Sequence, residues 1–311
     1  MPEDEYIWLP RDSVLTYEEI ERLVDLFGEQ GVDRVRLTGG EPLLRRDLPI
    51  LIERLASKPW LRDLALTTNG VLLADMAGDL KQAGLHRLTV SLDTLHRDKF
   101  QRLARLDGLP KVMAGIDAAR RAGFTGLKID SVITGGDNAD EMVDLVEFAR
   151  EVEAEVRFIE YMDVGGATQW RPELVVTRRE MLDRLSAHYG AITPIVEASS
   201  APAARFRLPN GATFGIISST SEPFCRTCDR ARLTADGVFL LCLYAQHGTD
   251  LRRPLRAGAS RDTLARLIEA VWAGRADRGA EERLAVRDRG TYIPIGMLKK
   301  DAHLEMHTRG G

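Results

Sequence analysis

The chain has 311 residues, of which 44% are hydrophobic and 29% charged, a composition that excludes a disordered or fibrous protein and suffices for one large domain or two ordinary ones. Its 43 Lys and Arg residues against 47 Asp and Glu residues give a net charge of -4, so the bulk charge favours neither a nucleic-acid nor a membrane partner. No apolar run approaches the roughly 18 residues of a membrane span, and the start Met1-Pro2-Glu3-Asp4-Glu5 is acidic, so we expect a cytoplasmic protein.

Short β-branched or apolar runs alternate with helical patterns from Tyr17 to about Tyr189. The runs predict strands at 33–38, 63–68, 87–92, 126–133 and 155–161. The helical patterns lie at about 17–30, 48–57, 72–83, 110–122, 138–151 and 178–189. Repeated βα units at this spacing predict an α/β fold whose parallel sheet is either doubly wound or curved into a barrel.

The pattern changes after Tyr189, where we place a domain boundary. Residues 190–224 are rich in Ala, Ser, Pro and Gly, with a turn signal at Pro209-Asn210-Gly211. The remainder carries all three cysteines and one good helical pattern at about 261–274, and we expect the final residues from His307 to be unstructured. The predicted domains are therefore 1–189 and 190–311.

Polar residues and glycines follow the predicted strands at the point where each strand ends. The segments are Thr38-Gly39-Gly40-Glu41-Pro42, Thr67-Thr68-Asn69-Gly70 and Ser91-Leu92-Asp93-Thr94, with Met162 just past the fifth strand. Turn formation or helix capping would explain each segment alone. Because ligands of parallel βα folds bind at the carboxyl ends of the strands, the segments together predict a pocket.

Lys128 lies inside the fourth predicted strand, where a lysine usually points to solvent. Strand alternation puts Lys128 on one face with Asp130, opposite to Leu127 and Ile129. If that face lines a barrel, the buried ammonium needs an anionic partner, and a bound phosphate would serve. A solvent-facing lysine and a phosphate ligand are both open at this point.

The three cysteines form a pattern typical of a metal or cluster site. Cys225 and Cys228 make a CxxC pair, and Cys242 follows after the intervening Asp229 through Leu241. Zinc, with His247 as the fourth ligand, and an iron–sulfur cluster fit this spacing equally well. A redox-active dithiol of Cys225 and Cys228 is the weaker interpretation, because it leaves the third cysteine unexplained.

Arg230 and Arg232 stand at alternate positions of a strand-like run beside the CxxC pair. They therefore project to one side, and paired guanidinium groups suit the bidentate recognition of phosphate. The alternative is a solvated strand edge. We interpret the pair as a clamp for a triphosphate or carboxylate next to the metal site.

Several longer motifs resemble a known family. They are WLPRDSVLTYEEI, RLTGGEPLLRRDLP, TTNG, TVSLDTL, GIDAARRAGF, RFIEYMDVGG, SEPFCRTCDRARLTADG, CLYA and the terminal Gly310-Gly311. Together they resemble, from end to end, the MoaA family of GTP 3',8-cyclases, radical S-adenosylmethionine (radical SAM) enzymes that begin molybdenum cofactor biosynthesis. GGEP alone indicates only the wider superfamily, whereas the three-cysteine motif with DRARL and the closing diglycine is specific to this family.

The resemblance implies a partial, open β/α barrel closed by the C-terminal domain, and it assigns residues to each ligand. S-adenosylmethionine would be bound by Gly40, Ser91 and Met162, with Gly39 and Glu41 in the same loop. GTP would be bound by Arg36, Thr67, Lys128 and the segment Arg230, Ala231 and Arg232. An auxiliary 4Fe-4S cluster, whose open iron binds the guanine base, would be held by Cys225, Cys228 and Cys242. The tail with Gly310 and Gly311 would reach into the active site.

The implied reaction converts GTP to (8S)-3',8-cyclo-7,8-dihydroguanosine 5'-triphosphate. A second 4Fe-4S cluster donates an electron to S-adenosylmethionine, the resulting 5'-deoxyadenosyl radical takes the 3' hydrogen of GTP, and the ribose carbon adds to C8 of guanine. The implied partners are GTP, an electron donor and the next enzyme of the pterin pathway, and a homodimer is compatible with the sequence.

The family's CxxxCxxC motif for that second cluster, which directly precedes a Met-Pro pair like Met1-Pro2, does not occur in this sequence. Either the native chain is longer, as the retention of the other site residues favours, or the chain is an inactive GTP-binding remnant. A chain without the first strand exposes an unpaired sheet edge, so we expect it to be poorly soluble or unstable as written. Two further hypotheses are a radical SAM maturase, which would share GGEP and auxiliary cysteines, and a plain zinc-binding βα protein.

Overall fold

The computed structural model describes residues 7–165, 167, 169–197 and 199–310. A large central sheet forms the middle of the fold. The sheet has the strand order β1-β2-β3-β4-β5-β8-β7-β6. Its strands are β1 (Arg34–Leu37), β2 (Asp63–Thr68), β3 (Arg87–Ser91), β4 (Lys128–Ile133), β5 (Glu155–Glu160), β6 (Thr193–Ile195), β7 (Ala204–Arg207) and β8 (Thr213–Ile217). Strands β1 to β5 and β8 run parallel, and β7 and β6 add antiparallel pairs at one edge.

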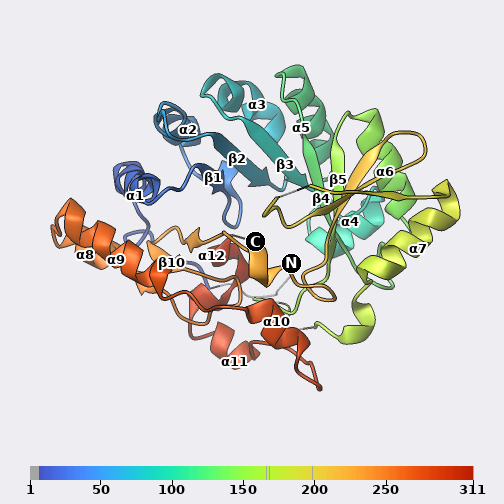
Figure 1. The fold of residues 1–311 in the computed structure, drawn as a ribbon. Helices are drawn as coiled ribbons and strands as arrows, with labels where there is room; N and C mark the ends of the chain where they lie inside the picture. The colour runs from blue at the N-terminus through green and yellow to red at the C-terminus, as the bar shows by residue number, and fades with distance from the viewer. Residues whose placement is uncertain (1–6, 166, 168, 198, 311) are drawn as a thin grey trace.

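The helices between the strands cover one face of this sheet (Figure 1). They are α1 (Tyr17–Glu29), α2 (Leu48–Ala56), α3 (Leu73–Gln82), α4 (Arg97–Ala104), α5 (Leu109–Arg121), α6 (Met142–Glu151) and α7 (Arg178–Tyr189). In β4 and β5 every second residue is buried, and Ile129 and Phe158, both 0% exposed, belong to the core beneath the helices. The intervening residues of both strands face the concave side of the sheet.

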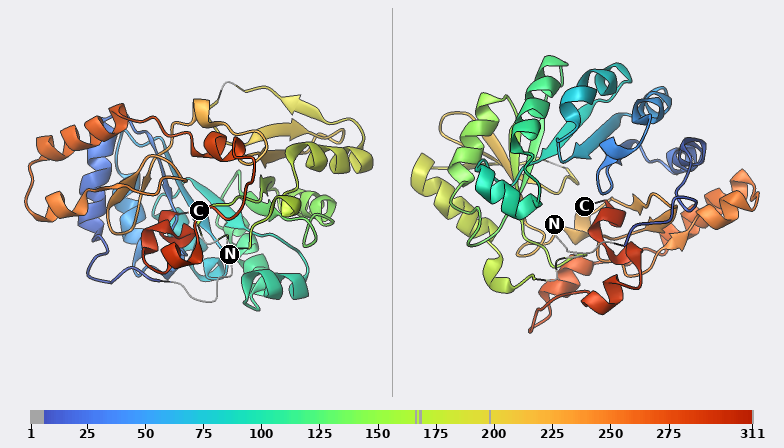
Figure 2. Two further views of the ribbon diagram at one scale, coloured as in Figure 1. Left: turned by 90° about the horizontal axis from the view of Figure 1, so that it is seen from below. Right: turned by 180° about the vertical axis from the view of Figure 1, so that it is seen from behind.

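The C-terminal elements lie across this concave side (Figures 1 and 2). They are the three-stranded sheet of β9 (Arg232–Leu233), β10 (Val238–Leu240) and β11 (Thr249–Asp250), and the helices α8 (Arg252–Arg256), α9 (Arg261–Ala273), α10 (Gly279–Leu284), α11 (Ile295–Leu298) and α12 (Met306–Arg309). A second apolar core joins them to the N-terminal part, because Leu23 and Leu26 of α1 pack with Leu264 and Ile268 of α9. We call residues 225–310 the cap.

The predicted α/β open barrel is confirmed, since within the described residues no strand pairing joins β1 to β6 and the sheet stays open. The five predicted strands and seven predicted helices are all present. The domain boundary at Tyr189 stays a prediction; the central sheet itself continues beyond it, through β6, β7 and β8.

The expectation of an unstructured tail is wrong for the described part of it. Residues 306–309 form the short helix α12, and Thr308 and Arg309 are buried. Arg309 donates hydrogen bonds to the carbonyl oxygens of His303 and Leu243, at 2.5 and 2.8 Å. Polar contacts to the rest of the cap therefore hold a segment that has too few apolar residues to reveal itself in the sequence. Gly311 lies outside the described residues.

Candidate functional site

Polar side chains form two adjacent rows on the concave face of the sheet. The register of the strands aligns Thr67, Thr89, Lys128 and Glu155 in one row. The next row, one step closer to the carboxyl ends of the strands, aligns Ser91, Asp130 and Arg157. Because side chains two residues apart on a strand share a face, the two rows form one continuous polar floor.

Arg36 extends from β1 across this floor. Its Nη1 donates hydrogen bonds to Oγ1 of Thr67, at 2.8 Å, and to Oγ1 of Thr89, at 3.1 Å. Burial is the main cause that lowers the pKa of Arg36. The structure thus brings together two of the predicted GTP residues, Arg36 and Thr67, and adds Thr89, which sequence reasoning missed.

Lys128 lies half-buried on the same floor, which excludes the interpretation of a solvent-facing surface lysine. Burial, reinforced by the positive charges of Arg157, Arg87 and Arg36, lowers the pKa of Lys128 to about 8, and Glu155 only partly opposes this. As expected, Lys128 shares its face with Asp130. A cluster of cations that depress one another's protonation suits an anionic ligand, whose charge would relieve their repulsion.

The loop after β1 is fixed by its glutamate. Oε1 of Glu41 accepts hydrogen bonds from the backbone N–H of Leu43, at 2.9 Å, and from the hydroxyl of Thr68, at 2.7 Å, while Oε2 accepts one from the N–H of Asn69 at 2.7 Å. Glu41 therefore ties the loop that carries Gly39 and Gly40 to the end of β2. A direct contact of these three residues with a cofactor stays a prediction.

Ser91 and Met162 stand at the ends of β3 and β5, on the same rim as the Gly39–Gly40 loop. Asp163, next to Met162, is fully buried and was missed in the sequence. Its carboxylate accepts hydrogen bonds from Arg283 at 2.8 Å, from Arg289 at 2.9 and 3.0 Å and from the hydroxyl of Tyr244 at 3.0 Å. Burial opposes ionisation, but the two arginines outweigh it and lower the pKa of Asp163. This network joins the rim of the sheet to the cap.

Two of the three cysteines, Cys225 and Cys242, lie at the start of α10. The backbone N–H groups of Ala280 and Glu281 point at the thiol of Cys225, and a Cβ added to Gly279 would lie 3.3 Å from Sγ of Cys242. Arg275 donates to the carbonyl oxygen of Cys228 at 2.8 Å and to its Sγ at 3.4 Å.

The thiols of Cys225 and Cys228 differ in their electrostatics. Burial raises the pKa of Cys225. Burial would also raise the pKa of Cys228, but hydrogen bonds and charge from Arg230, with the hydrogen bond from Arg275, lower it. Of these two thiols, Cys228 is thus the better prepared to act as a thiolate ligand. No three Cys, His, Asp or Glu side chains of the described ranges are close enough to hold a single metal ion.

Arg230 and Arg232 have different partners, since only Arg232 belongs to the strand β9, and their joint role as a clamp stays a prediction. Arg230 stacks over the ring of Phe224 and is exposed. Arg232 donates to the carbonyl oxygens of Arg309, at 3.1 Å, and of Gly310, at 2.6 Å. Burial, together with the charge of Arg230, lowers the pKa of Arg232 to about 10. Ala231 between them is exposed.

Gly310 touches the rim of the sheet. It has a φ of 72°, in the left-handed region that favours glycine, and a Cβ there would lie 2.5 Å from Cγ2 of Thr38. The tail therefore lies against the residue that follows β1, and a glycine is needed at position 310 because a side chain there would clash with Thr38. A catalytic role of Gly310 and Gly311 stays a prediction.

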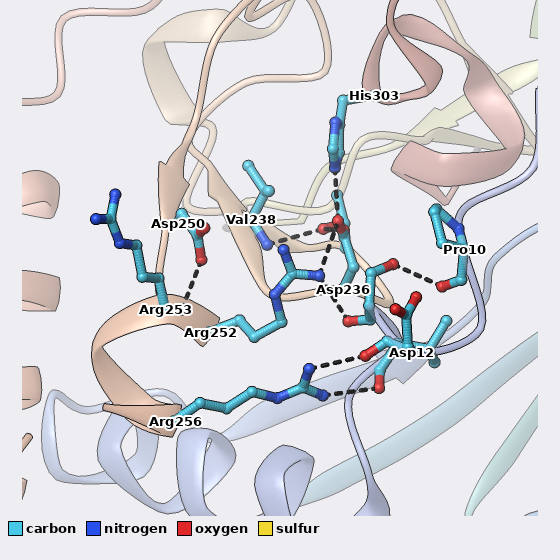
Figure 3. Close-up of polar contacts among 12 residues, drawn as sticks. Pro10, Asp12, Asp236, Val238, Asp250, Arg252, Arg253, Arg256 and His303 are labelled. Atoms are coloured by element: carbon cyan, nitrogen blue, oxygen red, sulfur yellow. Dashed lines mark hydrogen bonds and ion pairs between the residues drawn. The ribbon is translucent and has the colours of Figure 1, made fainter. Parts of the chain in front are cut away.

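A carboxylate of the cap anchors the tail (Figure 3). Nε2 of His303 lies 2.9 Å from Oδ2 of Asp236, and Nδ1 lies 3.0 Å from Oδ1 of Asp301. The hydrogen bond with Asp236 is the first cause that raises the pKa of His303. Arg252 approaches the same carboxylate at 3.7 Å. The figure also shows Arg256 reaching the backbone of residues 12–14, so the same region holds the segment before α1.

Known proteins and family models match both the N-terminal and the C-terminal part of the chain. Residues 4–149 match the family model "Radical SAM superfamily", and residues 154–281 match "Molybdenum Cofactor Synthesis C". GTP 3',8-cyclase 1 of Mycobacterium tuberculosis is 56% identical over 315 residues, covering 100% of this chain and 88% of that protein. The GTP 3',8-cyclase of Acidothermus cellulolyticus is 47% identical over 89% of this chain and 78% of its own length.

Among solved structures, SuiB of Streptococcus suis bound to S-adenosylmethionine aligns with a TM-score of 0.59 at 14% identity. The alignment covers 88% of this chain and 61% of that chain. At this identity the likeness concerns the fold alone. No helix of the described residues is both long and apolar enough to cross a membrane.

Proposed function

The chain belongs to the family of GTP 3',8-cyclases within the radical SAM superfamily, and from this premise we propose that it converts GTP to (8S)-3',8-cyclo-7,8-dihydroguanosine 5'-triphosphate. With this reaction the family begins molybdenum cofactor biosynthesis. The observation that carries the proposal is the cluster of cations on the polar floor of the sheet, where burial and neighbouring positive charge lower the pKa values of Arg36 and Lys128. We assign the cytoplasm as its compartment, and an electron donor and the next enzyme of the pterin pathway as its partners.

The floor and the cap together would bind the triphosphate. Arg36, Lys128 and Arg232 are all cations whose pKa values are lowered by burial and by neighbouring positive charge. Arg36 is already oriented by the hydroxyl of Thr67. An anion that binds beside these cations removes the repulsion that each of them feels from its own neighbours, so its binding free energy includes the recovery of that cost. Arg230, exposed beside Cys228, completes the positive surface.

S-adenosylmethionine would bind along the rim at the ends of β1, β3 and β5. Gly40 offers a backbone without a side chain, Ser91 is exposed at the end of β3, and Met162 follows β5. Glu41 holds the loop in place through its hydrogen bonds to residues of β2 and its own loop. When bound and reduced, S-adenosylmethionine supplies the radical that starts the chemistry.

Family membership implies 4Fe-4S clusters, and the donor set of the cap fits one of them at Cys225, Cys228 and Cys242. Each thiolate of a four-iron cluster binds a different iron, so the ligands stand farther apart than those of a single ion. Cys225 and Cys242 both border the start of α10, and Arg275, which precedes this helix, contacts Cys228, so the three thiols belong to one part of the cap, which supports a shared cluster. Arg275 and Arg230 donate to Sγ of Cys228 and would stabilise it as a thiolate.

The test is turnover by the protein purified from its own source under anaerobic, reducing conditions. We expect 5'-deoxyadenosine to form only when GTP is present, together with a product of the same mass as GTP that separates from it by chromatography. With GTP deuterated at C3', the deuterium should appear in 5'-deoxyadenosine. Cleavage of S-adenosylmethionine that is independent of GTP would contradict the proposal.

A further inference from the structure

One carboxylate of the floor has an oxygen without a partner. Asp130 lies in the middle of the second polar row, between Ser91 of β3 and Arg157 of β5. Its Oδ1 is buried and accepts no hydrogen bond from any residue of the described ranges. A buried acceptor without a donor costs free energy in the folded state, so such an atom calls for an explanation.

Positively charged side chains surround Asp130, but none of them donates a hydrogen bond to its Oδ1. Arg157, Arg36 and Lys128 are the positive groups that act on it, and Glu155 is the negative one. Burial nevertheless prevails and raises the pKa of Asp130. The position is therefore a hydrogen-bond acceptor set among phosphate-binding cations, at the level of the floor that lies next to the rim.

The chemistry of the site restricts what can satisfy this acceptor. A hydroxyl of a bound ligand would donate to this oxygen, whereas an ionised phosphate oxygen has no proton to donate. S-adenosylmethionine carries hydroxyls too, but it brings no phosphate that would satisfy the neighbouring cations Lys128 and Arg157. A group that carries hydroxyls and is attached to a triphosphate matches both the acceptor and the cations around it, and the ribose of a nucleoside triphosphate is such a group.

We propose that Asp130 accepts a hydrogen bond from a ribose hydroxyl of GTP and so selects the ribonucleotide over its deoxy analogues. The inference rests on the proposed function and adds a specificity-determining residue to it. Its place in the floor agrees with the reaction, because Asp130 pairs directly with Ser91, at the boundary between the nucleotide side and the S-adenosylmethionine side of the site.

The experiment compares binding of GTP, 2'-deoxy-GTP, 3'-deoxy-GTP, inosine triphosphate and S-adenosylmethionine to the anaerobically prepared protein with its cluster. In the unsubstituted protein at least one deoxy analogue should bind about tenfold more weakly than GTP. Asp130→Ala should weaken GTP about tenfold and leave that analogue nearly unchanged, so that the preference disappears. Asp130→Asn, which retains an acceptor and the shape, should keep part of the preference.

The matched control is Asp117→Ala, on the outer helix α5, where Asp117 pairs with Arg121 at 2.8 Å and is exposed. It should leave all five affinities unchanged. An equal ribose preference in Asp130→Ala and the unsubstituted protein, with both folded by thermal melting, would overturn the inference. So would an effect confined to inosine triphosphate, which reports the base, or to S-adenosylmethionine. Failure of the unsubstituted protein to bind GTP would contradict the proposed function itself.

Discussion

The floor of the sheet and the cap position their cations by different means. On the floor, Arg36 and Lys128 are placed by strand register, and their neighbours along the row come from adjacent strands. In the cap, Arg232 is placed by the backbone carbonyls of residues that lie far along the chain. The floor is therefore a consequence of a repeating pattern, while the cap depends on individual hydrogen bonds. Substitutions on the floor should therefore affect several neighbouring strands, whereas substitutions in the cap should act locally.

The largest effect should come from Asp163→Ala, which removes the contacts that join the rim of the sheet to the cap. Removing the carboxylate leaves Arg283 and Arg289 buried without their anion, and we expect a loss of about 3 kcal/mol in the free energy of unfolding. Denaturant titration measures the loss. Hydrogen exchange should increase around α10 and leave β2 to β5 protected.

The control for that substitution is Asp107→Ala, which breaks the exposed pair of Asp107 with Arg97 and should leave the free energy of unfolding nearly unchanged. Equal loss of protection in the central sheet and in α10 would show that the two regions unfold as one unit. The comparison between them would then be wrong.

A smaller effect concerns the pH dependence of GTP binding. Lys128 is charged below its pKa of about 8, and bound phosphate favours the charged form, so GTP affinity should fall as the pH rises above 8. Between pH 7 and pH 9 the contribution of Lys128 should fall by up to about tenfold, or about 1.4 kcal/mol. Calorimetry at the two pH values measures this.

Lys128→Arg supplies the comparison, since a guanidinium stays protonated throughout this range. Its GTP affinity should change much less between pH 7 and pH 9. If the variant and the unsubstituted protein lose affinity equally, another group titrates, and the assignment of Lys128 to the triphosphate would lose its support.

The smallest effect should appear in the tail. The pKa of His303 is raised by Asp236, so its contribution to stability is fully present below the unfolded value of about 6.5 and is lost as the pH rises through the folded value. His303→Ala should therefore loosen α12 by about 1 kcal/mol at pH 6 and by less at pH 9.

Limited proteolysis at the two pH values, followed by mass spectrometry of the C-terminal peptides, tests the tail. Asp236→Asn serves as the partner variant and should remove the same pH dependence. Cleavage of the tail that is independent of pH in the unsubstituted protein would speak against the anchoring role of His303.

The floor could be predicted from the sequence because its information is local. Alternation within β4 placed Lys128 and Asp130 on one face, and the carboxyl ends of the strands located the rim. The register of β3, β4 and β5 and the burial pattern of β4 in the structure agree with this prediction.

The cap could be predicted only at its motifs. The cysteines and the Arg230–Arg232 pair stood out by spacing, whereas Asp163 and its partner Arg289 are separated by 126 positions and carry no local signal. The short helix α4 was also missed, because Arg97–Ala104 buries only Phe100 and so lacks a clear apolar stripe. The order in α12 was missed for a related reason, since carbonyl acceptors outside that helix hold Arg309.

The strand order also bears on how the protein folds during synthesis. From β1 to β5 each strand pairs with the one before it, so every new βα unit meets a partner that has already left the ribosome. The cap comes last and must close contacts over long loops, including the packing of α9 on α1 across most of the chain. The nascent sheet therefore has its polar floor open to solvent until the cap has been synthesised and has packed on it.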